Sequence, residues 1–99
     1  MPNLKELDLN AKVGFTVISC TPVIIDKETE VTISGLYLSK VTLAFVQIGD
    51  EQIPLDVKAQ SDSNIVISLK KLTRSNISFM VVLYSENDGW YPVGPLLKK

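Results

Sequence analysis

The stretch Asn76-Ile-Ser-Phe-Met-Val-Val-Leu-Tyr84 is the longest apolar segment of the chain and decides the fold class. Its β-branched and aromatic residues favour a strand rather than a helix. The tetrapeptide Glu86-Asn-Asp-Gly89 follows and predicts a hairpin turn, because Asn, Asp and Gly tolerate positive φ angles. Trp90-Tyr-Pro-Val93 is then expected to return as a short final strand. The pattern therefore predicts a central strand, covered on both faces, at residues 76–84.

The rest of the chain has the same β character. Valine, isoleucine and threonine make up 26 of the 99 residues, whereas alanine occurs three times. Short apolar runs at a spacing of 8–12 residues predict about seven strands, and thus an all-β fold, a single antiparallel immunoglobulin-like β-sandwich. Pro54 lies inside the run 52–58, which places that strand at an edge or a bulge. The expected core residues are Phe15, Val17, Val31, Ile33, Leu43, Phe45, Ile65, Ile67, Phe79, Val81 and Leu83.

Four short motifs occur in a fixed order along the chain. They are Ser19-Cys-Thr-Pro22, Val31-Thr-Ile-Ser-Gly35 with Leu36 and Tyr37, Phe45-Val-Gln-Ile-Gly49, and Ser61-Asp-Ser-Asn-Ile-Val-Ile67. Together they resemble the IPT/TIG branch of immunoglobulin-like domains over about 75 residues. In place of the family's Gly-rich turn, this chain has Asp26-Lys-Glu-Thr-Glu30. The resemblance implies a sandwich whose motif residues serve the core and the turns, with no catalytic residue to transfer.

Composition excludes several classes of function. Ten basic and eleven acidic residues give a net charge of −1, which provides no field to attract nucleic acid or an anionic membrane. Histidine is absent, and one cysteine, Cys20, excludes an internal disulfide and a multi-cysteine zinc site. The first residues contain no apolar stretch of export-signal length, and no run is long enough to span a bilayer.

The residues that could serve catalysis or metal binding are better explained by structural roles. No histidine is present to activate Cys20, so we interpret it as a partly buried structural thiol. The acidic clusters at 50–51, 62 and 86–88 lack the spacing of a calcium loop and are interpreted as turns. We expect no enzyme activity, no catalytic residues, no cofactor and no metal site.

The two ends of the chain are unusually apolar. We divide the chain into an N-terminal arm at 1–12, a sandwich domain at 13–94 and a C-terminal tail at 95–99. The arm either adds a strand to its own sheet or docks onto a neighbour. Two prolines near the C-terminus are expected to prevent ladder pairing there. The residues proposed to contact a partner are Leu4, Leu7, Leu9, Trp90, Tyr91, Leu96 and Leu97.

These features predict a non-catalytic structural or binding module. The leading hypothesis is a virion accessory protein, such as a bacteriophage head-decoration or other capsid or tail component, assembled in the host cytoplasm. Its partners would be virion proteins, or other copies of itself as a homo-oligomer, with no nucleic acid and no membrane. One alternative is a carbohydrate-binding or adhesion module of a longer bacterial surface protein, with Trp90 and Tyr91 contacting a glycan. Another is a spacer domain of a larger enzyme.

Overall fold

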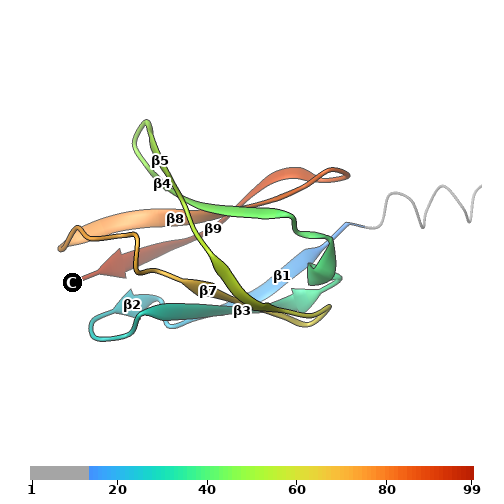
Figure 1. Ribbon diagram of the computed structural model, residues 1–99, viewed down its shortest axis with the longest axis horizontal. Helices are drawn as coiled ribbons and strands as arrows, with labels where there is room; N and C mark the ends of the chain where they lie inside the picture. Colours follow the sequence, from blue (N-terminus) through green and yellow to red (C-terminus); the bar gives the residue numbers. More distant parts are fainter. Residues whose placement is uncertain (1–13) are drawn as a thin grey trace, which may run out of the picture.

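The computed structural model describes residues 14–99, which form two packed β-sheets (Figure 1). A single 3-10 turn, η1 (Leu38–Lys40), lies between the third and fourth strands. The strands in the described part of the chain are β1 (Thr16–Thr21), β2 (Ile24–Ile25), β3 (Glu30–Leu36), β4 (Leu43–Ile48), β5 (Glu51–Pro54), β6 (Val57–Gln60), β7 (Asn64–Ser68), β8 (Ile77–Ser85) and β9 (Gly89–Lys98).

The strand order is that of an immunoglobulin-like sandwich. One sheet has the order β1-β3-β7-β6, and the other has the order β2-β9-β8-β4-β5. The first corresponds to the A-B-E-D order of immunoglobulin domains, and the second contains their C-F-G strands. Adjacent strands pair antiparallel except β2 and β9, which run parallel. The all-β fold predicted from the sequence is confirmed.

The strand count exceeds the predicted seven for two reasons. The two-residue strand β2 carries too little pattern to be found in the sequence. The expected strand at 52–58 is instead divided between β5 and β6, which belong to different sheets. The chain crosses between the sheets at Leu55, which is buried and donates its backbone N–H to the Ala44 carbonyl at 2.9 Å. Pro54 ends β5, an edge strand, as its missing N–H requires.

Eight of the eleven expected core residues are buried between the sheets. These are Phe15, Val31, Ile33, Ile65, Ile67, Phe79, Val81 and Leu83. Val17 is partly buried and packs against this core. Leu43 and Phe45 were assigned to the wrong face, because Ala44 and Val46 are the β4 residues that point inward. Both alternating sets of β4 are apolar, so periodicity alone could not choose between them.

The C-terminal residues extend the sheet, which corrects the expectation of an unpaired tail at 95–99. Strand β9 pairs with β8 as far as Lys98, and Gly94 and Pro95 fall in a bulge opposite Met80. The bulge removes the proline from the ladder, so pairing resumes at Leu96. Figure 1 shows β8 and β9 as the long pair of their layer.

Two contacts fix the N-terminal strand. A Cβ atom placed on Gly35 would lie 1.8 Å from the Thr16 carbonyl oxygen, so β1 and β3 approach as they do because residue 35 is glycine. In the β8–β9 hairpin, Asp88 accepts hydrogen bonds from the Phe15 backbone N–H at 3.3 Å and from the Ser85 hydroxyl at 2.6 Å. Gly89 has a φ of 72°, in agreement with the predicted turn.

Candidate functional site

The outward side of the five-stranded sheet, here called the outer face, is mostly apolar and carries no charged residue. Side chains alternate along a strand, so the residues between the buried ones belong to this side. An antiparallel sheet with one solvated side normally carries polar residues there. The outward positions are Ile24 on β2, Leu43, Phe45 and Gln47 on β4, Gln52 and Pro54 on β5, Ser78, Met80, Val82 and Tyr84 on β8, and Trp90, Pro92 and Leu97 on β9.

An aromatic cluster occupies one end of the outer face. Trp90 packs edge-on against Phe45, with ring centroids 5.4 Å apart and planes at 73°, and against Tyr84 at 4.3 Å. Trp90 nevertheless remains 60% exposed and Leu43 remains 54% exposed. Val82 is only 7% exposed although it points outward, because it pairs between Phe45 and Pro92. The cluster therefore covers the outward side of β8, and part of it still faces solvent.

A shallow hollow of about 270 Å³ opens beside this cluster. Its lining is apolar apart from one amide, and comprises Leu43, Ala44, Phe45, Gln52, Pro54 and Trp90. The Gln52 side-chain amide donates to the side-chain oxygen Oε1 of Gln47 at 3.1 Å. The hollow thus offers hydrophobic surface with few polar groups to recognise a ligand.

The opposite sheet shows the ordinary pattern. Lys58 on β6 forms an ion pair with Glu30 on β3, and the Ser34 hydroxyl donates to the side-chain amide oxygen Oδ1 of Asn64 at 2.9 Å. These polar pairs lie on the outward side of the four-stranded sheet, where Ile18 and Leu36 are also exposed. The two outward sides therefore differ in charge and in aromatic content, because the outer face lacks charged residues and carries the aromatic cluster. Such asymmetry is typical of a surface that another molecule covers.

Trp90 and Tyr91, which only the glycan-binding alternative places together, point to opposite sides of β9. Trp90 belongs to the outer face, whereas Tyr91 pairs with the buried Leu83 and packs edge-on against Phe15 at 5.5 Å. They also lie within a strand rather than on a loop. They therefore do not form a single stacking platform.

The predicted partner-contact leucines separate into three groups. Leu97 is 40% exposed and lies next to Ile24 on the outer face, at the end remote from Trp90. Leu96 is 1% exposed and belongs to the core, so the expectation that it contacts a partner is wrong. Leu4, Leu7 and Leu9 lie outside the described residues.

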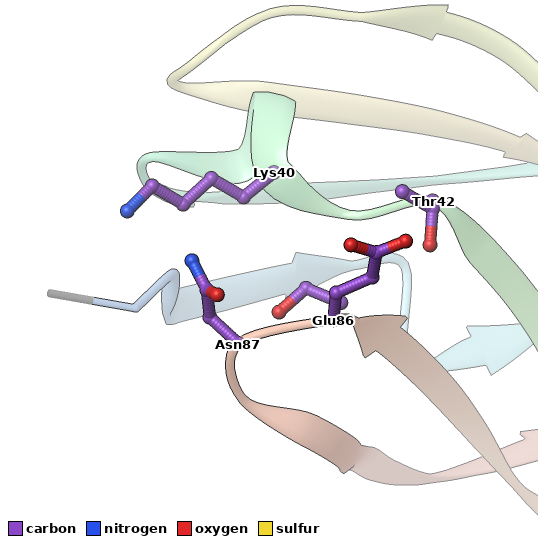
Figure 2. A pocket seen from close by; sticks show the side chains of 5 residues that line it. Lys40, Thr42, Glu86 and Asn87 are labelled. Atoms are coloured by element: carbon purple, nitrogen blue, oxygen red, sulfur yellow. The ribbon is translucent and has the colours of Figure 1, made fainter. Parts of the chain in front are cut away.

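A second hollow, of about 290 Å³, lies at the end of the β8–β9 hairpin (Figure 2). It is lined by Lys40, Thr42, Ser85, Glu86 and Asn87. The Lys40 ammonium and the Glu86 carboxylate extend toward opposite ends of it. The Ser85 hydroxyl donates to Asp88 and accepts from the Asp88 backbone N–H at 3.1 Å. Ser85 therefore serves the turn and is not presented as a nucleophile.

The chemistry available at Cys20 is limited. Burial raises the pKa of the Cys20 thiol above its ordinary value, which keeps it protonated and weakly nucleophilic at neutral pH. Within residues 14–99, no three His, Cys, Asp or Glu side chains gather as metal ligands would. In the same part of the chain, no helix has the length and apolarity needed to cross a membrane.

Comparisons with known proteins identify a fold and no function. No protein-family model matches the chain, and no curated protein sequence is significantly similar to it. The chain is structurally similar to a protein of unknown function from Bacteroides thetaiotaomicron VPI-5482, with a TM-score of 0.65 and 13% sequence identity. The match covers 87% of this chain but 22% of that one, so the chain spans about a fifth of the Bacteroides protein. At this identity the likeness shows the β-sandwich fold alone.

Sequence reasoning missed most of the outer face. It selected Trp90 and Leu97, but it placed Phe45 and Leu43 in the core and gave no role to Tyr84. The signal was present as apolar residues in both alternating positions of the runs at 43–48 and 77–85. That pattern indicates either a strand covered on both sides or a strand with an exposed apolar side, and the second case applies here.

Proposed function

We propose that the chain is a non-catalytic protein-binding module, and that the outer face is its docking surface. The observation that supports this function is the asymmetry of the sandwich: the outer face has no charged residue and a 60% exposed Trp90, whereas the opposite sheet carries charged and polar pairs among its exposed residues. Aromatic residues and Met are enriched at protein interfaces, where they supply large contact areas. The described residues show no competing catalytic arrangement, since the Cys20 thiol is protonated and Ser85 is committed to a turn.

A protein fits this surface better than a glycan does. Sugar recognition combines an aromatic platform with polar groups that bind the hydroxyls, but the hollow beside Trp90 contributes only Gln52, which already bonds to Gln47. Tyr91 on the opposite side of β9 cannot extend a platform. We therefore keep glycan binding as an alternative result of the experiment below.

We further propose that the module acts as an accessory subunit of a virus particle. An analogy supports a role in a virus particle, since phage particles often display immunoglobulin-like domains. Leu97 and Ile24 add apolar area to the docking surface, and a repeated lattice would multiply a modest single-site affinity. The localisation that follows is the virion, with assembly in the host cytoplasm.

We also propose membership of the IPT/TIG branch of the fold. Gly35, the glycine of the Val-Thr-Ile-x-Gly motif, supports it because this residue permits the close approach of β1. Gly49, which ends the third matching motif, has a φ of 55° in the turn between β4 and β5.

Co-purification with particles tests the proposed function. Virus particles from a lysate of the source culture are banded by density, and the bands are probed with an antibody against the chain. We expect the chain in the particle band, and we expect tagged Trp90→Glu protein added to particles to bind at least tenfold less than the wild type. Absence of the chain from the particle band would contradict the virion setting. Binding to a glycan array that Trp90→Glu abolishes would favour the adhesion alternative instead.

A further inference from the structure

We infer that the outer face is the interface of a symmetric homodimer. The inference rests on the proposed function, because it takes this face to be a protein-docking surface. It names a second copy of the chain as the occupant in the free protein, and a particle subunit would replace that copy. Three properties of the face support this choice over an unrelated protein: its charge, its size and its preformed aromatic cluster.

The first property is the absence of charge. A twofold axis packs a surface patch against the same patch of its partner, so charged residues near the axis would meet residues of the same sign. None of the thirteen outward positions of the five-stranded sheet is Asp, Glu, Lys or Arg. A face adapted to a charged partner would instead carry the complementary charge. The nearby ion pair between Arg74 and Glu51 lies beyond the outward positions, at the start of β5.

The second property is size. Strand β8 has nine residues, which at about 3.3 Å per residue gives a length of about 30 Å. Five strands at a spacing of about 4.8 Å, several of them shorter than β8, give the face an outline on the order of 500 Å². A standard interface buries about 800 Å² on each partner. Projecting side chains such as Trp90 add to the flat outline, so the accessible area of the face approaches what each partner buries in a small dimer interface.

The third property is preorganisation. Trp90 is held against Tyr84 and Phe45, and Val82 beneath the cluster is already 7% exposed. These side chains lose little conformational freedom when a partner covers them, which reduces the entropic cost of association. Leu97 and Ile24 place further apolar contacts at the opposite end of the face. Contacts at both ends would fix the orientation of the second copy.

Analytical ultracentrifugation of the full chain, from about 1 to 500 µM, tests the inference. The wild type should sediment at twice the chain mass of 10.9 kDa. Trp90→Glu and Leu97→Glu place a charge at either end of the face, and each should raise the dimer Kd at least tenfold. The matched control is Ile18→Glu, which charges a side chain of β1 that is 67% exposed and lies on the other sheet. Circular dichroism verifies that each variant retains its strand signal and melts cooperatively.

The outcomes separate the dimer from the docking function. A wild type that remains monomeric at 500 µM overturns the dimer, as does a dimer that withstands both face variants or is broken equally by Ile18→Glu. If a monomeric wild type binds particles and Trp90→Glu does not, the dimer fails while the proposed function stands. If the wild type dimerises through this face but is missing from particles, the dimer stands and the virion setting fails. Should Trp90→Glu not fold, Leu97→Glu decides the result.

Discussion

Leu96→Ala should strongly destabilise the protein, because Leu96 is a core residue at the end of the chain. Its side chain is 1% exposed, and a Cβ atom placed on Gly94, two residues earlier, would lie 2.8 Å from the Leu96 Cδ1 atom, so the site is tightly packed. The substitution removes three carbons, worth about 2.4 kcal/mol at about 0.8 kcal/mol per methylene. The residual cavity raises the expected loss in free energy of unfolding to about 3–5 kcal/mol. For a domain of this size, the melting temperature should fall by about 12 °C or more.

The assay is urea unfolding followed by circular dichroism, with Leu97→Ala as the matched control. Leu97 is the next residue on the same strand and is 40% exposed, so its truncation should cost about 1 kcal/mol or less. The two variants make the same substitution at neighbouring positions, so a difference between them reports the difference in burial. Equal losses in free energy of unfolding for the two variants, or a loss below about 1 kcal/mol for Leu96→Ala, would refute the burial of Leu96 by the part of β9 that follows the bulge.

Further substitutions test the contacts that fix the N-terminal strand and the thiol. Gly35→Ala should lower the free energy of unfolding in urea by about 2–3 kcal/mol, since the new Cβ would meet the Thr16 carbonyl oxygen. Gly49→Ala has open space around its Cβ and should lower it only by the strain of the 55° φ, about 1–2 kcal/mol. A larger loss for Gly49→Ala would contradict the close approach of β1 and β3 at Gly35. Asp88→Ala should cost about 1–3 kcal/mol by leaving the buried Ser85 hydroxyl without its acceptor, and equal stability to the wild type in thermal melts would exclude that role. Alkylation of Cys20 in the folded protein should have a pH midpoint above that in denaturant, because burial raises the pKa of this thiol. The stability that the neutral thiol contributes is complete below the unfolded-state pKa and declines as the pH rises through the folded-state pKa. Coincident midpoints in the folded and denatured protein would contradict the burial of Cys20.

Local chemistry made the fold predictable from the sequence, and long-range packing limited that prediction. The β8–β9 hairpin follows from Asn87, Asp88 and Gly89, whose conformational preferences act within four residues. The division of 52–58 between two sheets depends on where Leu55 finds a buried position, which no local pattern specifies. Likewise, the bulge that lets β9 continue past Pro95 depends on its place opposite Met80 on another strand, between the pairs Phe79–Leu96 and Val81–Val93. The prolines in the sequence therefore indicated where strand pairing is interrupted, but they did not indicate that pairing resumes after them.

The error in the core and the identity of the candidate site have one physical origin. Burial between the sheets demands apolar residues at alternate positions, which Ala44 and Val46 satisfy on β4. Nothing in that requirement makes Phe45 apolar, since it points away from the core. When the outward set of a strand is as apolar as the inward set, folding explains one set and a second contact must explain the other. On β4 and β8 the unexplained set comprises Leu43, Phe45, Val82 and Tyr84, which with Trp90 carry the aromatic end of the docking surface. The ambiguity that misled the choice of core residues is thus the feature by which an interface of this kind can be recognised in a sequence.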